Sequence, residues 1–372
     1  MVAAPAAPVT GSAAWLADLA GAPLPVRRQE DWRFTDLAPL HTVAPQLWSG
    51  SDPFAGVVLP DGVTPLQPSE TLALQEQVLQ ATGSAAAWPV LLNQGAAPRC
   101  LALRVSGAAG PLQLDVAAGA APGLRAVQVL LLLDDGASLE LLLHPSSSGA
   151  NATSLLAAAQ LGRDARLQLG VLAPGDPRAC LLAHLVVSQQ AGSHLQLTTA
   201  TAGWALSRLE PRIVQREGAA HTRLRALQLV NGQEIADTHS LVRFEGPDGE
   251  LDQLHKVVAD GAGRSVFNGA VQVPQPAQQT NAAQLSRSLL LSERARVDTK
   301  PELEIVADDV KCAHGATVSR LQQNELFYLQ SRGIGADQAA RLLLRGYCEE
   351  VLRELPAAAA LNPLQLLLRE RP

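Results

Sequence analysis

Lysine and aromatic residues are scarce in this chain of 372 residues. Aromatic side chains make up 3% of the sequence, and the only lysines are Lys256, Lys300 and Lys311. Acidic residues outnumber basic ones by 35 to 29, which gives a formal net charge of -6. Nucleic-acid binding needs a basic face that attracts phosphates. The charge balance therefore argues against nucleic acid as the main partner.

Cysteines and long apolar runs are also rare. The four cysteines are widely spaced, at Cys100, Cys180, Cys312 and Cys348. A chain of this length can bury its own core and needs no disulfide framework, so we expect free thiols and a reducing cytoplasm. The densest apolar run, residues 127–133, is too short to cross a bilayer. The N-terminus lacks the positive charge and compact apolar stretch of a signal peptide.

Familiar catalytic motifs are missing as well. No GxxxxGK[ST] occurs, so the chain is not expected to hydrolyse nucleotides by itself. No HExxH or GxSxG is present. The lack of a CxxC pair excludes a zinc ribbon or a redox dithiol.

The texture of the sequence divides the chain into three zones. Residues 1–90 are rich in Ala and Pro and hold four of the five tryptophans. Residues 11–21 and 68–83 are typical of short helices, because each opens near a serine that could serve as an N-cap and closes at a glycine. We expect an N-terminal helical region that ends near residue 90.

A repeat runs through the second zone, residues 91–318. Short strands with alternating apolar residues follow small residues, which are Ala137, Ala165, Ser193, Ala220 and Gly249. The spacing between these small residues is about 28 positions, which indicates one supersecondary unit stacked on copies of itself. Helical patterns are absent between the strands. The zone is therefore expected to be a β-solenoid, with a large β-sandwich as the alternative.

The third zone, residues 319–372, is expected to be helical. One helix ends at Gly333, and a second begins after Gly335 and stops at Pro356. The second helix carries an apolar face at spacings of three and four, which consists of Ala340, Leu343, Leu344, Tyr347, Val351 and Leu355. The Leu-rich tail at 361–372 either packs on the chain's own solenoid or docks another subunit.

Cys312 and His314 are the candidate ligand residues, in the stretch "ADDVKCAHGATV". Side chains two apart on a strand share one face, with Cα atoms about 6.6 Å apart. Asp308 would join them if the strand were unbroken. Two ligands do not close a four-ligand metal site, so the missing ligands must come from elsewhere in the fold, from solvent or from a partner. The alternative is a buried structural cysteine beside an ordinary histidine.

The C-terminal half contains "VFNG", "LLLS", "VDTKPELEI", "ADDVKC-HGAT" and "LFYL-SRGI", and "RRQEDWRFTDL" lies near the N-terminus. With these motifs the chain resembles the SufD family of iron–sulfur cluster assembly proteins. The resemblance covers residues 237–350 and that short piece. The resemblance implies a mainly β fold, a right-handed parallel β-helix between helical N- and C-terminal parts.

The resemblance also implies a function, that of a non-enzymatic scaffold subunit. Such a subunit pairs with a SufB-like paralogue and recruits a SufC-like ABC ATPase through its C-terminal helices, for which Leu343, Leu344, Tyr347 and Val351 are the candidates here. Cys312 and His314 map onto the motif at the SufB interface. We expect a transient iron–sulfur cluster shared there, none held stably by the lone chain, and a homodimer as an option when the partner is absent.

Two alternatives from other classes remain open. One is a β-helical enzyme with its own metal or carboxylate site, which needs a groove with converging acids or a third ligand near His314. The other is a purely structural half of a dimer, in which His314 has no role in assembly.

Overall fold

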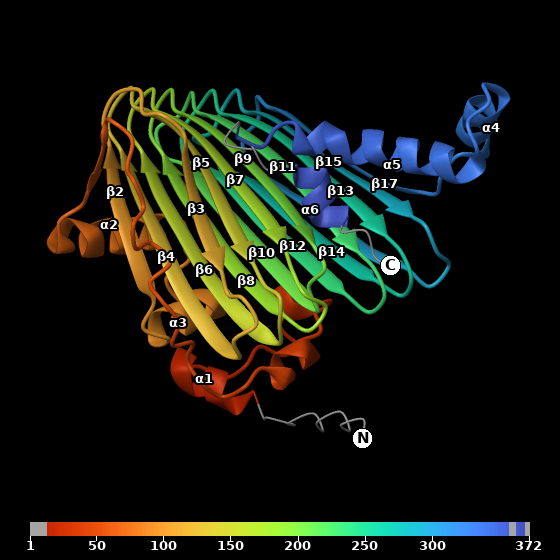
Figure 1. The fold of residues 1–372 in the computed structure, drawn as a ribbon. Helices are drawn as coiled ribbons and strands as arrows, with labels where there is room; N and C mark the ends of the chain where they lie inside the picture. The colour runs from red at the N-terminus through yellow and green to blue at the C-terminus, as the bar shows by residue number, and fades with distance from the viewer. Residues whose placement is uncertain (1–12, 357–361, 369–372) are drawn as a thin grey trace, which may run out of the picture.

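The structure is a computed structural model that describes residues 13–356 and 362–368. Its core is a parallel β-helix made of two facing sheets (Figure 1). Successive strands alternate between the sheets, so two strands make one turn. This confirms the predicted solenoid and excludes the sandwich, because from β2 onward each strand pairs in parallel with the strand two positions along the chain.

We call the two sheets even and odd, after the numbers of their strands. The even sheet consists of β2 (Arg99–Val105), β4 (Gly123–Leu133), β6 (Asn151–Leu161), β8 (Cys180–Gln189), β10 (Leu206–Gln215), β12 (Ile235–Phe244), β14 (Arg264–Val273) and β16 (Arg296–Ile305). Its first edge is covered by the short antiparallel strand β1 (Val63–Pro65). The odd sheet consists of β3 (Leu112–Ala117), β5 (Ser138–Ser146), β7 (Arg166–Pro174), β9 (His194–Ala202), β11 (His221–Val230), β13 (Glu250–Ala259), β15 (Asn281–Leu290) and β17 (Lys311–Ser319).

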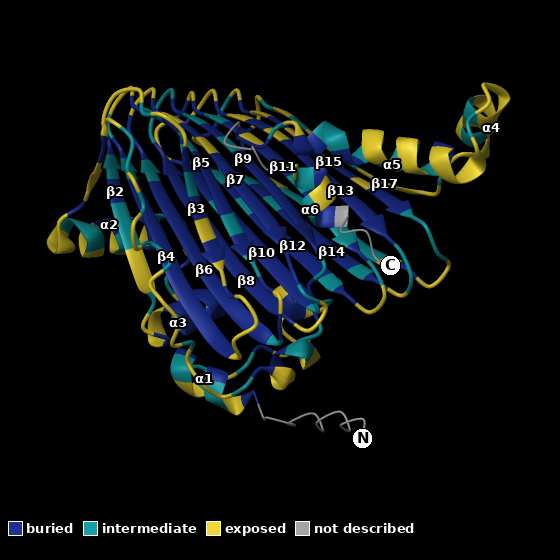
Figure 2. Cartoon of the chain, in the orientation of Figure 1, coloured by how far each residue is buried: buried dark blue, intermediate teal, exposed yellow. Residues whose placement is uncertain are grey.

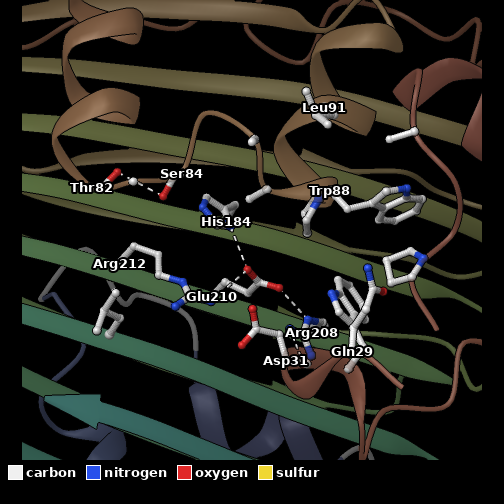
Figure 3. Close-up of a pocket in the computed structure, with 18 of the residues that line it drawn as sticks. Gln29, Asp31, Thr82, Ser84, Trp88, Leu91, His184, Arg208, Glu210 and Arg212 are labelled. Atoms are coloured by element: carbon white, nitrogen blue, oxygen red, sulfur yellow. Dashed lines mark hydrogen bonds and ion pairs between the residues drawn. The ribbon is translucent and has the colours of Figure 1, made fainter. Parts of the chain in front are cut away.

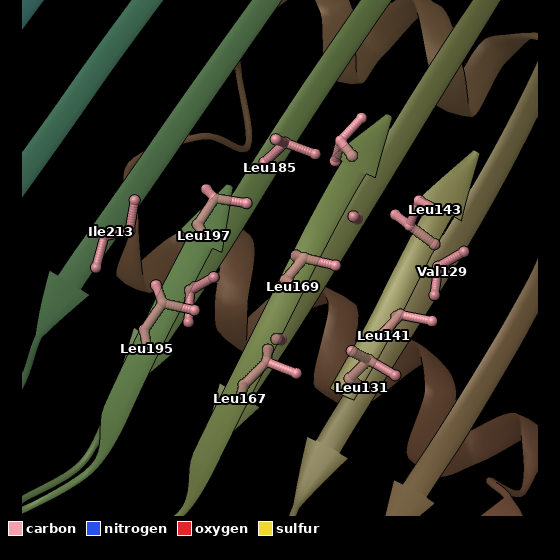
Figure 4. Packing of buried hydrophobic residues seen from close by; sticks show 14 of the residues in the cluster. Val129, Leu131, Leu141, Leu143, Leu167, Leu169, Leu185, Leu195, Leu197 and Ile213 are labelled. Atoms are coloured by element: carbon pink, nitrogen blue, oxygen red, sulfur yellow. The ribbon is translucent and has the colours of Figure 1, made fainter. Parts of the chain in front are cut away.

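The main core fills the space between the two sheets. In the first half of the β-helix the inward positions are mostly Leu, Val and Ala, and Figure 4 shows these side chains meeting from both sheets. Leu141, Leu169 and Leu197 lie at equivalent register positions on β5, β7 and β9. Because side chains alternate along a strand, every second one points inside. The repeat from turn to turn then places similar side chains above one another.

The small residues that revealed the repeat lie directly before the odd strands. Ala137, Ala165, Ser193 and Ala220 are fully buried in successive turns. At Gly249 an added Cβ would lie 2.4 Å from the Phe244 ring. The corner of the solenoid therefore has room only for small side chains, which explains why the sequence repeats there.

The N-terminal region covers the outer face of the even sheet. Its helices are α1 (Ala14–Ala20), the 3-10 segments η1 (Glu30–Trp32) and η2 (Ala38–Thr42), α2 (Pro68–Ala81) and α3 (Trp88–Gly95). The two predicted helices are confirmed as α1 and α2, although residues 11 and 12 lie outside the described part. Ser69 is not the cap of α2: Gln67 precedes the helix, and its N–H donates to Glu70 at 3.0 Å.

The C-terminal helices are α4 (Gln323–Ser331), α5 (Ala336–Leu352) and α6 (Pro363–Leu368). Two of the three, α5 and α6, contact the outer face of the odd sheet, whereas α4 contacts α5. Gly335 precedes α5 and Asp337 lies in its first turn, as predicted. Leu364 and Leu367 of α6 pack on this sheet, so the described part of the tail packs on the chain's own solenoid. In Figure 1, α4 and the start of α5 extend past β17.

None of the described helices is long and apolar enough to cross a membrane.

Candidate functional site

The last turn of the β-helix ends in two strand edges that no described residue pairs with. Among the described strands, β16 pairs only with β14, and β17 pairs only with β15. Ile305, Val306 and Val318 are exposed there. Figure 2 shows the contrast between the buried strands of the middle and the exposed last turn. An uncovered edge with apolar side chains is typical of a surface that pairs with another chain.

Cys312 and His314 lie on the inner face of this last turn. On β17 they stand in register with Ala282 and Gln284 of β15, which are buried inside the solenoid. Cys312 is half-buried and packs against the end of the main core, whereas His314 is exposed. The predicted shared face is therefore confirmed, and it points into the open end of the β-helix.

Burial raises the pKa of the Cys312 thiol, and a backbone hydrogen bond from Ala282 only partly offsets this effect. A thiolate, not a thiol, is the metal ligand and nucleophile. The surroundings of Cys312 in the single chain thus favour the thiol over the thiolate.

No third ligand joins this pair. Within the described residues, no group of three or more His, Cys, Asp or Glu side chains is placed to hold a metal ion. Asp308 does not take part, because β17 begins only at Lys311 and Asp308 lies in the preceding loop, where it accepts a hydrogen bond from Gln275. Within the described residues, Cys312 and His314 are therefore a pair of candidate ligands without a third.

A polar interior beneath this site was not foreseen from the sequence. Gln228 on the odd sheet accepts from Ser265 (2.6 Å) and donates to Thr238 (2.8 Å), both on the even sheet. Gln253 donates across to Ser240 at 2.8 Å. These bonds cross between the sheets and therefore lie inside the solenoid. The interior changes from apolar to mixed as the chain approaches the open end.

The apolar face of α5 lies against the chain itself. Val351 is fully buried, and Leu344 and Tyr347 pack in the same cluster over the odd sheet. The Tyr347 hydroxyl donates to the Arg287 carbonyl at 2.7 Å, and Lys256 lies 3.8 Å from its ring centroid. The prediction that Leu343, Leu344, Tyr347 and Val351 dock an ATPase stays a prediction. Within the chain, Val351 is buried, and Leu344 and Tyr347 are half-buried against the odd sheet.

Other apolar residues of this region remain accessible. Phe327 and Tyr328 on α4 and Leu342 on α5 are exposed, and Leu343 is half-buried. We call α4 and the first half of α5 the C-terminal arm. The arm has exposed apolar side chains, whereas the apolar face of α5 that was predicted to dock the ATPase lies against the odd sheet.

A second polar site lies on the outer face of the even sheet, beside the N-terminal segment. A cavity of about 760 Å³ has His184, Arg208, Glu210 and Arg212 in its floor (Figure 3). Arg208 donates to Glu210 at 2.6 Å, and His184 Nδ1 lies 3.2 Å from the other oxygen of Glu210. Burial alone would raise the pKa of Glu210, but Arg208 and His184 outweigh it and hold the pKa well below its ordinary value.

This charged cluster attaches the motif at residues 27–37. Arg208 lies 3.7 Å from the centroid of the Trp32 ring and donates to the Asp31 carbonyl at 2.9 Å. Thr35 and Arg208 both donate to Asp237. Buried charges that are paired and hydrogen-bonded hold segments in a fixed arrangement. The geometry explains "RRQEDWRFTDL" as a docking segment for the β-helix.

Comparison with known proteins identifies the class to which this fold and open end belong. The family described as SUF system FeS cluster assembly, SufBD core domain, matches residues 117–347, which is more than half of the chain. The chain belongs to this family. The match begins well before residue 237, where the resemblance in the sequence becomes evident.

Individual relatives are similar over shorter stretches. An iron–sulfur cluster assembly SufBD family protein of Synechocystis is 43% identical over 178 residues, 48% of this chain and 39% of the relative. The chloroplastic protein ABCI7 of Arabidopsis thaliana is 42% identical over 46% of this chain and 36% of its own length. The iron–sulfur cluster assembly protein SufD of Escherichia coli is 39% identical over 36% of this chain and 31% of its own length. The matched region thus spans under half of each relative.

Proposed function

We propose that this chain is a non-enzymatic scaffold subunit of a SufB–SufC–SufD-type complex that assembles iron–sulfur clusters for transfer to target proteins. The observation that carries the proposal is the open end of the β-helix. It joins two unpaired strand edges, exposed apolar residues and a two-ligand half site in one place. A SufB-like paralogue with its own open β-helix end is the partner that would cover the edges and complete the site.

The cluster is cargo in this scheme, and it is shared across the interface. His314 supplies an imidazole and Cys312, after loss of its proton, a thiolate, and the remaining ligands come from the partner. The lone chain is then expected to hold no stable cluster. Anaerobic reconstitution of the isolated chain with iron and sulfide checks this, and a stoichiometric cluster on the lone protein would contradict the proposal.

Pairing through the open end is tested by Val318→Asp, with co-purification of the SufB-like partner as the measurement. We expect the pair to be lost, because a carboxylate would be buried without a counter-charge. Leu72→Asp is the matched control, since Leu72 is exposed on α2, at the far side of the molecule. Persistence of the pair in Val318→Asp would contradict the interface.

His314→Ala separates a scaffold with a ligand from a purely structural subunit. The pair is expected to form as in the wild type, while the yield of assembled cluster falls by roughly ten- to a hundredfold, the range typical for loss of a group that tunes a metal site. Unchanged assembly would favour the purely structural dimer.

Recruitment of a SufC-like ATPase is assigned to the C-terminal arm. Phe327→Asp is expected to abolish co-purification of the ATPase while leaving the SufB-like pair intact. Tyr347→Asp serves as the contrast, because it should destabilise the chain itself rather than remove one partner. We place the complex in the cytoplasm, although one relative is chloroplastic.

A further inference from the structure

A hydrogen-bonded ladder of side chains leads toward the open end inside the last turns. Gln253 Nε2 donates to Ser240 Oγ at 2.8 Å, and Gln284 Nε2 donates to Gln253 Oε1 at 2.9 Å. Each amide nitrogen thus donates to a residue earlier in the chain. Each amide oxygen is left to accept from a residue later in the chain. At Gln284 the series stops, because its Oε1 is buried without a hydrogen-bond partner in the described structure.

The amide of Gln284 is held by its surroundings. An added Cβ at Gly269 would lie 2.4 Å from Gln284 Nε2, so the glycine makes room for this amide group. The bond to Gln253 fixes which end of the amide faces back into the solenoid. The unpartnered oxygen is therefore a feature of the packing rather than of a side chain that swings in solvent.

His314 lies directly above Gln284 in the stack. The two residues are register partners on β15 and β17, on the same inward face. Gln284 is only 3% exposed although a single turn follows it, so the last turn must cover it. The imidazole at the matching position carries a ring N–H, which is the kind of donor that the buried oxygen lacks.

We propose that Gln284 is a positioning residue for His314, an inference that rests on the proposed function of His314 as a cluster ligand. When the His314 ring turns toward Gln284, one of its ring nitrogens would donate to the amide oxygen, which has no partner in the described structure. The other ring nitrogen then keeps its lone pair and faces the open end, where the partner's ligands would stand. Histidine ligands commonly have their tautomer and ring orientation set by such a bond to a carbonyl or carboxylate.

The test is the tautomer of His314, read by NMR of the ring nitrogens in the full chain labelled at histidine. The His314→Gln variant assigns the signals. In the wild type, alone or paired with the SufB-like partner, we expect one nitrogen to be protonated and the other not, as two well-separated signals. In Gln284→Leu the two signals should move toward each other as the tautomers mix, and in Gln284→Glu, which restores an acceptor, they should stay apart.

Gln253→Leu is the matched control. It removes an equally buried glutamine from the same ladder, one turn further from His314, and should leave the His314 tautomer as in the wild type. Cluster yield in the complex should fall by roughly tenfold or more in Gln284→Leu but not in Gln284→Glu.

The inference is overturned if Gln284→Leu leaves both His314 nitrogen signals unchanged in the isolated chain and in the pair. It is also overturned if Gln253→Leu shifts them equally, since the effect would then be one of general packing. Two results together would contradict the proposed function but leave the positioning role in place. They are a fixed His314 tautomer in the wild type and full cluster assembly in the His314→Ala variant.

Discussion

The two halves of the β-helix are built on the same backbone repeat but enclose different interiors. In the first half, residues such as Leu143, Leu169 and Leu197 fill the space between the sheets. In the second half, Gln253, His255 and Gln284 share that space with apolar residues. A parallel repeat specifies strand spacing without specifying chemistry. The core can therefore change from purely apolar to partly polar over a few turns. The change runs toward the end that carries Cys312 and His314.

The largest effect is expected in the apolar half. Leu143→Ala should lower the free energy of unfolding by about 2–5 kcal/mol, because Leu143 is fully buried and close-packed neighbours relax only partly around a cavity. Urea denaturation measures the loss. Leu72→Ala, at a position 69% exposed, should change stability by about 0.5 kcal/mol or less. A loss in Leu143→Ala as small as that would show that the apolar half is not tightly packed.

In the polar half, the pH dependence of the free energy of unfolding tests the interior, because a histidine is buried there. His255 is stacked on Phe267 with centroids 4.3 Å apart, and burial lowers its pKa from 6.5 to about 3. Below about pH 6.5, His255 therefore binds a proton in the unfolded chain but not in the folded chain. The free energy of unfolding then falls by about 1.4 kcal/mol per pH unit as the pH drops from about 6.5 toward 3.

The variant His255→Leu should lose that contribution to the slope. Unfolding free energies measured between pH 7 and 5 would show a flatter pH dependence than in the wild type, whatever the absolute stability of the variant. Parallel slopes would mean that His255 takes up a proton inside the folded chain, and that the polar half admits charge.

Two serines of the polar half should respond with opposite signs. Ser265 donates to Gln228 at 2.6 Å, so Ser265→Ala leaves a buried acceptor unpaired and should cost about 1–3 kcal/mol. Ser288 is buried and its hydroxyl has no hydrogen-bond partner in the described structure, so Ser288→Ala should be neutral or stabilising by up to about 1 kcal/mol. Equal losses in the two variants would show that the Ser288 hydroxyl also has a partner, such as an ordered water.

The sequence predicted the fold well because its strongest signal is steric. Ala137, Ala165 and Ser193 recur where the solenoid corner has no room, and this recurrence favoured a solenoid over the sandwich that the strand pairing then excluded. The helix α3 was missed, since Trp88–Gly95 is short and has a proline near its start. The pairing of Cys312 with His314 followed from strand alternation alone.

Other features of the site could not be predicted, for a physical reason common to all of them. Alternation divides the residues of each strand between two faces, but it does not show whether Gln253 on β13 and Gln284 on β15 point to the inside or the outside. The apolar stripe of α5 shows that Val351 is covered but not by which surface. Asp308 would have shared the face of His314 only on an unbroken strand, and nothing in the local sequence marks where β17 begins. Each of these depends on contacts between turns rather than on the local pattern.

The number of turns in the β-helix also determines how far the C-terminal arm reaches past the open end. The C-terminal half of α5 contacts β9 and β11, and three further strand spacings separate β11 from β17, roughly 14 Å at about 4.8 Å each. A 17-residue helix is about 25 Å long, so the reach of the C-terminal arm past the open end depends on how many turns follow its anchor. Deleting one turn between β11 and β17 would push the arm about 5 Å further out. The number of repeats thus sets the distance between the open end of the β-helix and the tip of the C-terminal arm.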